Sequence, residues 1–558
     1  MKIRAFLYDL ARNQEIRPAY MRFLIERLAA HGFNMLVINI EHRFDFAACP
    51  GMAPPGSLTA SSAQALVCHG KKFGIDVVAQ PNFIGHCEGW SALERYAHLS
   101  CDPWLQTGWG GYEQINFSLP KTRKLVARML EEVCVAFPGT YLHIGADEIR
   151  RMEYLHPADE SRREQELENQ LGALLALAGK HGRQLLMWGD MLLAHPALRR
   201  LVSKETMICD WHYEAAGSRE TLAQFRDEGF PVLATPAVST CYSFLSDPVE
   251  SHGNIRKMLA DADELELEGF LLTSWHFSAG STCDLIWPWV AFAGEVAAGK
   301  KVPGWRAWLA RYFKTRHGGN GGAFARLHEL LHVRLASLVG GSERLDGHLK
   351  LARLRYGLFR GAEFSAAPAR NVPVPESSHQ AIWEPSPFQV WLTLRPILDR
   401  ARRRQLRTLA REVDAASRAV QREAKTNREE LLSCTSLARA FAIMVLRIEI
   451  LERAKTAYHE AALAQPGDAR TFKRKIRQTA ELLEKIRPGI RELGRLSKQL
   501  ADRTGVDAEE TRWLVIHEKS LDEHLSALRS WPHAGNALLE FGEFLRRPAH
   551  ITQRVPWR

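Results

Sequence analysis

The first 300 residues alternate between short apolar runs and longer segments with helical periodicity. In segments 19–32 and 121–137, apolar residues recur three or four positions apart, which is typical of an amphipathic helix. Continuous apolar strands that alternate with helices predict parallel strands buried on both faces. The apolar runs are IRAFLYD (3–9), NMLVINI (34–40), DVVAQP (76–81), TYLHIGAD (140–147), QLLMWGD (184–190), TMICDW (206–211), PVLATPA (231–237) and GFLLTSW (269–275).

Eight strand–helix units within residues 1–300 match the size of a (β/α)8 barrel, which typically has about 250 residues. The alternative is a doubly wound open sheet. Neither of the glycine-rich nucleotide-binding patterns follows any of the runs, so the sequence indicates no bound nucleotide. We therefore expect an α/β fold with a (β/α)8 TIM barrel over residues 1–300, which would carry the catalytic site.

Beyond residue 300 the pattern becomes entirely helical. We expect a helical extension packed on the barrel over 301–370 and a basic all-α domain over 381–558. The proline-rich stretch 371–388 predicts a seam between them. Two sets of apolar residues repeat at helical spacing and predict a helix bundle: Leu406, Leu409, Val413, Ala416 and Val420, and then Leu482, Ile486, Ile490 and Leu493.

The composition is that of a soluble globular protein. Of the 558 residues, 25% are charged and 46% are hydrophobic, and no apolar run approaches the roughly 20 residues that cross a bilayer. The first residues contain no apolar signal region. Nine cysteines without a C-x-x-C pair predict free thiols. We expect a cytoplasmic protein with no membrane partner.

The net charge of +10 comes from residues 381–558, which hold 33 basic and 23 acidic residues. The basic runs 399–411 and 473–477 suggest a nucleic-acid-binding patch as one function class. Apolar positions at helical spacing interrupt both runs, and acidic residues follow them. This favours a solvated helix face, and we expect no nucleic-acid partner.

A barrel places its functional side chains at the carboxyl ends of its strands. Two adjacent carboxylates there, Asp147 and Glu148, would be costly to bury without a function, whereas a surface turn is the alternative. Further polar and aromatic residues follow other predicted strands and favour a site in one mouth: Asn39, Glu41, Asn82, His86, Trp188, Asp190, Trp211 and Trp275.

The segment HIGADE (143–148) resembles the H-x-G-G-D-E motif of glycoside hydrolase family 20, the β-N-acetylhexosaminidases, with Ala146 in place of the second glycine. RAFLYDLAR resembles the first-strand pattern of that family, with Arg4 at its first arginine. His86 of PNFIGH is similar to the histidine of a later family segment. Three tryptophans fall where strands five, six and eight of the family supply an aromatic pocket: Trp188, Trp211 and Trp275.

Within the family, the chain most resembles the hexosaminidase D type, which begins directly at the barrel and lacks a glycine at the Ala146 position. Glu41 resembles the glutamate that ends the second strand in that branch. Tyr242 is similar to the tyrosine that binds the acetamido oxygen, and Asp284 to an acidic ligand of the sugar hydroxyls.

The resemblance implies a substrate-assisted mechanism, in which the 2-acetamido oxygen of the substrate attacks the anomeric carbon. Glu148 would protonate the leaving oxygen and then deprotonate water. Asp147 would orient the acetamido group and stabilise an oxazolinium intermediate. Arg4 would grip the sugar hydroxyls, and His86 and His143 would support the acidic pair.

The implied activity is an exo-β-N-acetylhexosaminidase that removes terminal β-linked GlcNAc or GalNAc with retention, without a metal or cofactor. The alternatives are an inactive N-acetylhexosamine-binding relative and a different acetamido-sugar hydrolase. The preference between GlcNAc and GalNAc and the natural aglycone stay open. For the helical region, covering the mouth, extending the core and forming a homodimer are all open.

Overall fold

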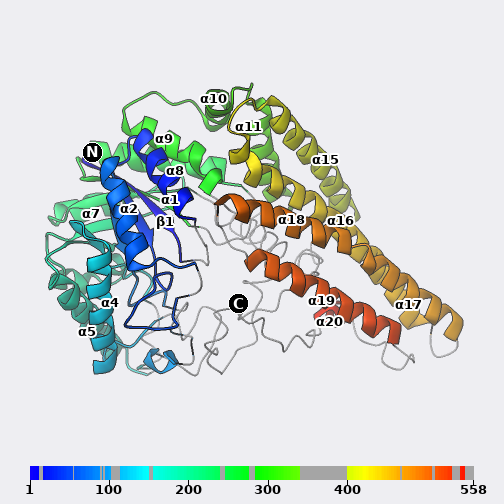
Figure 1. Cartoon of the computed structure of the whole chain (residues 1–558), viewed down its shortest axis with the longest axis horizontal. Coiled ribbons are helices and arrows are strands. Elements are labelled where there is room, and N and C mark those ends of the chain that lie inside the picture. The colour runs from blue at the N-terminus through cyan, green and yellow to red at the C-terminus, as the bar shows by residue number, and fades with distance from the viewer. Residues whose placement is uncertain are drawn as a thin grey trace.

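The structure is a computed structural model of the whole chain (Figure 1). Seven cysteines whose side chains the structure describes are free thiols: Cys49, Cys68, Cys87, Cys101, Cys134, Cys209 and Cys434. The structure describes all residues except 12–16, 54–55, 88–90, 92, 94, 102–113, 150–154, 157, 239–244, 276–282, 340–398, 465–467, 505–508, 531–540 and 547–558.

The amino-terminal part is a parallel barrel. Its strands lie in the order β3-β2-β1-β9-β7-β6-β5-β4, and β8 pairs with β9. Only Pro236 separates β7 from β8, so the two form one barrel strand. β3 lies beside β4 and nearly closes the circle, which confirms the predicted (β/α)8 barrel. The strands are β1 (Ile3–Asp9), β2 (Met35–Asn39), β3 (Asp76–Gln80), β4 (Tyr141–His143), β5 (Gln184–Trp188), β6 (Met207–Trp211), β7 (Val232–Thr235), β8 (Ala237–Val238) and β9 (Gly269–Ser274).

Helices cover the outside of the barrel and begin at residues suited to helix starts. Proline, which needs no amide partner in a first turn, opens α1, α4 and α8. The Thr59 side chain caps α2 in a capping box with Ser62. Both helices predicted from periodicity are confirmed, as α1 and α4. The barrel helices are α1 (Pro18–Ala30), α2 (Ala60–Lys72), α4 (Pro120–Ala136), α5 (Glu160–Gly179), α6 (Asp190–Ala194), α7 (Arg219–Asp227), α8 (Pro248–Glu264) and α9 (Trp287–Ala297).

Side chains inside the barrel form layers, because alternate residues of each strand point inward. The lower layers are apolar and include Leu7, Val37, Val78 and Leu186. The last inward positions have a different character. The same alternation places there four polar and three aromatic residues, which we call the mouth layer: Asp9, Asn39, Gln80, His143, Trp188, Trp211 and Trp275.

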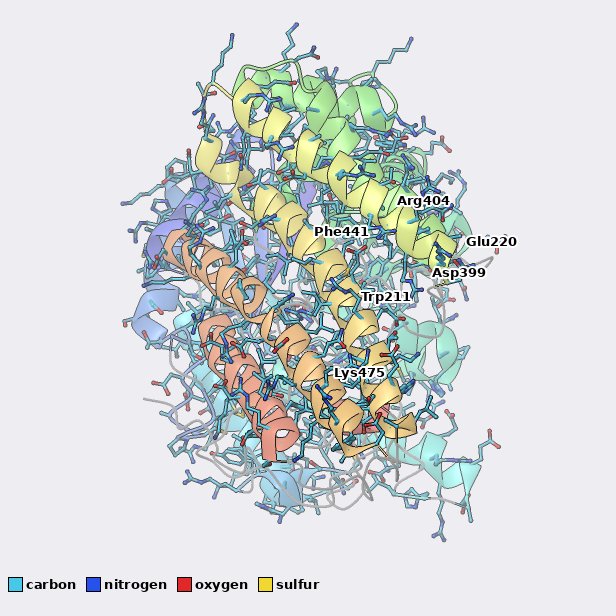
Figure 2. All side chains as sticks on the ribbon, turned by 90° about the vertical axis from the view of Figure 1, so that its right-hand side faces the viewer. Trp211, Glu220, Asp399, Arg404, Phe441 and Lys475 are labelled. Atoms are coloured by element: carbon cyan, nitrogen blue, oxygen red, sulfur yellow. The ribbon has the colours of Figure 1, made fainter. Side chains whose placement is uncertain are left out.

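The rest of the described chain is helical, as predicted (Figure 1). In Figure 2, the labelled residues Arg404, Phe441 and Lys475 mark the positions of α15, α16 and α17. The elements are α10 (Trp305–His317), α11 (Gly322–His328), a π-helical turn (Glu329–Arg334), α12 (Leu335–Val339), α15 (Arg400–Glu423), α16 (Leu432–Leu463), α17 (Ala469–Glu484), α18 (Arg487–Thr504), α19 (Glu509–Ser530) and α20 (Phe541–Arg546).

Two apolar cores divide the helical region. The barrel core continues through α10, α11 and α12 into α15 and the first half of α16. A second core joins the end of α16 to α17, α19 and α20. The apolar set at 482–493 lies in the helix bundle, as predicted, and is divided between two helices, because α17 ends at Glu484 and α18 begins at Arg487. The predicted seam 371–388 lies outside the described residues.

Among the described residues, the segment Arg428–Leu463 is long and apolar enough to cross a membrane, with a mean hydropathy of 1.6. However, 78% of its apolar window is buried within the protein. It packs against α15, α17 and α18. Burial in the bundle therefore accounts for its apolar composition.

Buried ion pairs join the helical region to the barrel. Glu430, just before α16, accepts a hydrogen bond from Arg316 Nε of α10 at 3.0 Å and lies 4.0 Å from Arg27 of α1. In a second pair the helical region supplies the positive charge: Arg503 of α18 donates to the buried Asp284 at 2.8 Å. A buried ion pair is strongly destabilising when only one partner is removed, so these contacts resist separation of the two parts.

Candidate active site

The two adjacent carboxylates leave the barrel on a tightly wound loop after β4. Gly145, Ala146 and Glu148 all have left-handed backbone angles, with φ of 70°, 67° and 50°. A Cβ at Gly145 would lie 1.5 Å from Asn82 Oδ1, so only glycine fits there. Left-handed non-glycine residues cost about 1–3 kcal/mol each and tend to cluster at functional sites. Glu41, Asn82 and His86, on the neighbouring strand-end loops, are left-handed as well.

His86 lies against both carboxylates. Its Nε2 is 3.2 Å from Glu148 Oε2 and 3.5 Å from Asp147 Oδ2. The preceding Gly85 brings the two loops together, because a Cβ there would lie 2.5 Å from the Asp147 carbonyl oxygen. The structure therefore assembles the three side chains that the sequence separates by about 60 residues.

A third carboxyl group, Asp190, follows β5 and borders the pair. Its Oδ2 accepts the backbone N–H of Glu148 at 2.8 Å, and its Oδ1 accepts the indole N–H of Trp211 at 3.3 Å. Burial raises the pKa of Asp190 to about 7, and the nearby charge of Asp147 contributes to the rise. The sequence placed Asp190 at a strand end, but only the fold shows what it contacts.

Aromatic rings make up the other half of the mouth layer. Trp188 is fully buried, and its ring centroid lies 4.5 Å from that of His143 and 6.1 Å from that of Trp275. Tyr213 joins the remaining rings, since it stacks on Trp211 at 5.0 Å and accepts the indole N–H of Trp275 at 2.8 Å. Sequence analysis missed Tyr213, although it lies only two residues beyond β6.

The mouth layer and the loops that carry Asn82 and Asp147 contain buried side-chain atoms without a partner among the residues that the structure describes. They are Asn39 Oδ1, both side-chain atoms of Gln80, Asn82 Oδ1, His143 Nε2, Asp147 Oδ1 and Trp188 Nε1. An unsatisfied buried polar group costs about 1–3 kcal/mol. Such atoms next to the acidic pair suit a ligand that is rich in hydroxyl and amide groups.

His143 is a neutral hydrogen-bond donor in this layer. Burial lowers its pKa to about 3, so the ring carries no charge near neutral pH. Nδ1 accepts the backbone N–H of Gly145 at 3.0 Å. Because a neutral imidazole has one hydrogen, that hydrogen is on Nε2, which can donate it to a ligand.

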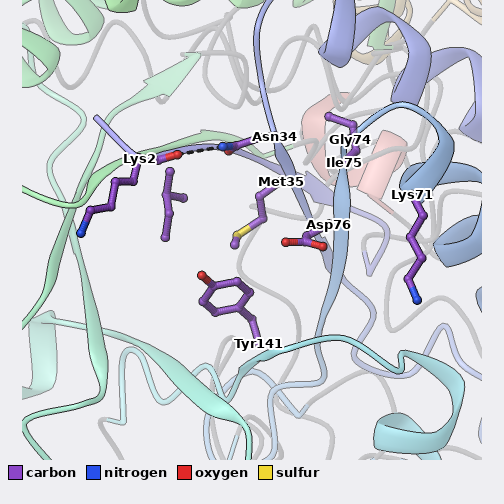
Figure 3. Close-up of a pocket in the computed structure, with 9 residues that line it drawn as sticks. Lys2, Asn34, Met35, Lys71, Gly74, Ile75, Asp76 and Tyr141 are labelled. Atoms are coloured by element: carbon purple, nitrogen blue, oxygen red, sulfur yellow. Dashed lines mark hydrogen bonds between the residues drawn. The ribbon is translucent and has the colours of Figure 1, made fainter.

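A cavity lies at the amino ends of β1, β2, β3 and β4 (Figure 3). This cavity of about 400 Å³ is lined by Lys2, Asn34, Met35, Lys71, Asp76 and Tyr141, among others. Asn34 Nδ2 donates to the Lys2 carbonyl oxygen at 2.7 Å, and Lys2 Nζ pairs with Glu268 at 3.2 Å. Since barrel enzymes carry their chemistry at the carboxyl ends of the strands, this cavity is not the candidate site.

Comparison with known families agrees with the arrangement in the mouth. Residues 2–261 match the catalytic domain of glycosyl hydrolase family 20. Over these residues, a little under half of its length, the chain is similar to this family. Glycosyl hydrolase family 20 is the family that the HIGADE motif suggested, whereas the hexosaminidase D subtype stays a prediction.

Several solved structures of family 20 members match part of the chain at low identity. The exo-β-N-acetylglucosaminidase of Vibrio harveyi, solved with N-acetylglucosamine, is 20% identical, with a TM-score of 0.44 and 56% of each chain covered. A β-N-acetylhexosaminidase of Bacteroides fragilis is 16% identical, with a TM-score of 0.44 and coverage of 53% of this chain and 65% of that one. The chitobiase of Flavobacterium johnsoniae is 16% identical, with a TM-score of 0.46 and coverage of 87% and 78%. The matched part thus spans about half the length of the Vibrio harveyi protein.

Two residues that were assigned from the family 20 resemblance do not reach the mouth. Arg4 lies near the amino end of β1, where it donates to the carbonyl oxygens of Gly32 and Met1. It points outward because it alternates with the inward-facing Ala5. Asp284 is buried, and its carboxylate accepts hydrogen bonds from Tyr20 and Arg503. These contacts tie it to the helical region, so neither residue is assigned to sugar binding.

The remaining predicted residues of the family 20 site have different outcomes. His86, His143, Trp188, Trp211 and Trp275 border the acidic pair or belong to the mouth layer, as described above. Glu41 belongs to a buried hydrogen-bond network, in which Asn39 Nδ2 donates to Glu41 Oε1 at 3.1 Å and to Asp9 Oδ1 at 3.0 Å. Tyr242 lies outside the described residues.

The basic runs 399–411 and 473–477 pair with acidic side chains of α16. Arg403 contacts Glu452 at 2.5 Å, Arg407 contacts Glu449 at 2.9 Å, and Lys475 pairs with Glu460. These contacts support the interpretation of the runs as helix faces in a bundle. Among the described residues, no group of three or more metal-binding side chains is present.

Proposed function

We propose that the protein is an exo-β-N-acetylhexosaminidase that releases terminal β-linked GlcNAc or GalNAc with retention of configuration. The observation that carries the proposal is the loop that holds Asp147 and Glu148 side by side, with His86 Nε2 within 3.5 Å of both carboxylates. Most retaining glycosidases instead attack with a separate carboxylate about 5 Å from the acid. Neighbouring carboxylates suit a reaction in which the substrate supplies the nucleophile.

In this mechanism, Glu148 acts as general acid and then as general base. It protonates the leaving glycosidic oxygen while the 2-acetamido oxygen attacks the anomeric carbon. Asp147 accepts the acetamido N–H, orients the group and stabilises the positive charge of the oxazolinium intermediate. Glu148 then takes a proton from water, which attacks the same face that the leaving group left. Two displacements at one carbon therefore retain its configuration.

The two halves of the mouth layer suit the two faces of such a substrate. The rings of Trp188, Trp211 and Trp275 offer apolar walls for the acetamido methyl group and the sugar ring. Gln80 and His143 offer buried amide and imidazole groups for hydroxyls. Water displaced by the sugar would leave the charged groups in a less polar setting, which strengthens their interactions.

The test is release of nitrophenol from the aryl β-GlcNAc, β-GalNAc and β-glucoside substrates. Turnover of the acetamido sugars without turnover of the glucoside is expected, and the anomer formed first should be β. Glu148→Gln should lower kcat by about 100- to 10,000-fold, the usual range for a general acid. Glu131→Gln, on the exposed face of α4, is the matched control and should keep full activity.

Undiminished activity of Glu148→Gln, or equal turnover of the glucoside, would overturn the proposal. Binding of N-acetylglucosamine without turnover would support the sugar-binding relative instead. A cytoplasmic location and a homodimer stay predictions.

A further inference from the structure

We propose that Asp190 is a positioning residue that holds the general acid and an aromatic wall of the site with a single carboxylate. The inference rests on the proposed hydrolase function and extends it to a residue that the HIGADE motif does not contain. Asp190 would act through Glu148 and Trp211 rather than on the substrate.

The order of the strands explains why one side chain reaches both partners. β5 lies between β4 and β6 in the barrel. Glu148 follows β4, Trp211 ends β6, and Asp190 follows β5. A short side chain at the middle position can therefore contact both neighbours, and Asp190 does so with separate oxygens, at 2.8 Å and 3.3 Å.

The bond to Glu148 bears on the direction of its side chain. Glu148 has a φ of 50°, which an L-residue adopts only when its surroundings impose it. The N–H that Asp190 accepts belongs to the peptide immediately before the Glu148 Cα, so it sets the plane from which that side chain departs. The hydrogen bond to Asp190 therefore favours the backbone conformation of Glu148, the general acid.

The bond to Trp211 bears on substrate binding instead. Trp211 is only partly buried, so packing alone does not fix its ring. The hydrogen bond from its indole N–H to Asp190 restricts rotation of the ring. Tyr213 stacks on one face of the ring at 5.0 Å. Asp190 fixes the edge and Tyr213 fixes the face, so the exposed side of the indole is presented in one orientation.

The two contacts predict separable kinetic effects. Asparagine at position 190 retains only one acceptor oxygen, so Asp190→Asn should lower kcat about 10- to 100-fold, as expected for a misplaced catalytic group. Trp211→Phe keeps a ring but removes the N–H, and should raise KM about 2- to 10-fold, in line with one lost hydrogen bond. In the double variant, the effects on KM should be less than additive, because both changes break the same bond.

A matched control is available one strand away. Asp210 is also a buried carboxyl group at a strand end, but it faces α7, where it accepts the Thr221 hydroxyl at 2.6 Å. Asp210→Asn therefore reports the cost of neutralising a buried strand-end carboxylate without touching the site. It should leave kcat and KM on aryl β-GlcNAc close to those of the wild type.

The experiment compares kcat and KM of these four variants, with the melting temperature of each. Equal kinetics for Asp190→Asn and Asp210→Asn would overturn the inference. Should Asp190→Asn fail to fold, Trp211→Phe decides, and an unchanged KM would overturn the role of the bond. Lack of turnover by the wild type would contradict the hydrolase function alone. The same variants are then compared by titration with N-acetylglucosamine, where Asp190→Asn and Trp211→Phe must bind more weakly than Asp210→Asn.

Discussion

Substitution of Gly145 tests whether the loop that carries the acidic pair is held by its close approach to Asn82. An alanine there meets two obstacles, a φ of 70° and an Asn82 Oδ1 only 1.5 Å from the new Cβ. The left-handed backbone costs about 1–2 kcal/mol. Displacement of a buried neighbour adds about 1–3 kcal/mol, as in other overpacked sites. Gly145→Ala should therefore lose roughly 2–5 kcal/mol of folding stability.

Two other glycines separate the contributions. Gly182 has a φ of 62° and no atom within 4 Å of where a Cβ would lie, so Gly182→Ala should show the backbone cost alone, about 1–2 kcal/mol. Gly139 also has open space around it, and no left-handed φ, so Gly139→Ala should be close to neutral. Only Gly145→Ala should also reduce activity, because it moves Asp147 and Glu148.

The assay is chemical unfolding at equilibrium, read as the shift of the transition midpoint, together with kcat/KM on aryl β-GlcNAc. Because a chain of this size can unfold in more than one step, the transition of the barrel is followed. The reasoning would be refuted if Gly145→Ala matched Gly182→Ala in both stability and activity. Removal of the amide in Asn82→Ala should restore part of the loss in the double variant.

Three further predictions concern the mouth layer and the ion pairs between the barrel and the helical region. Arg503→Ala leaves the buried carboxylate of Asp284 without its arginine and should cost about 3–5 kcal/mol of folding stability, seen as a lower melting temperature. The control is Arg17→Ala, which removes an exposed ion pair with Asp502 of the same helix, α18, and should cost about 0–1 kcal/mol. His143, with a pKa lowered from 6.5 to about 3, stays neutral in the folded protein while the unfolded chain takes up a proton, so stability should fall as pH drops from 6.5 toward 3; unfolding midpoints of His143→Gln should depend less steeply on pH, and an equal slope would contradict this. Gln80→Leu removes both unpartnered amide atoms, so the melting temperature should stay or rise while KM increases; a lower melting temperature with unchanged KM would show a structural role instead.

Local pattern was enough to predict the elements of the barrel. The eight apolar runs became its strands, and the periodic segments became α1 and α4, because period-two and period-3.6 burial are properties of consecutive residues. The HIGADE motif likewise located the acidic pair, since both carboxylates and their strand are contiguous. The apolar set at 482–493 located the bundle, but apolar spacing does not report the break between α17 and α18 before Arg487.

The direction and partners of single side chains were decided by the tertiary structure. Arg4 fits a sequence pattern, but strand alternation and position in the barrel turn it away from the mouth. Asp284 follows a strand-end tryptophan, yet its carboxylate pairs with Arg503, which lies 219 positions further along the chain. Asp190 contacts both Glu148 and Trp211 only because the fold places β5 between β4 and β6. The sequence by itself determined which segments form strands and helices and where the adjacent carboxylates lie, because burial period and motif are local. Which of those residues meet was decided by packing across the barrel, because contacts between distant segments depend on strand order and register.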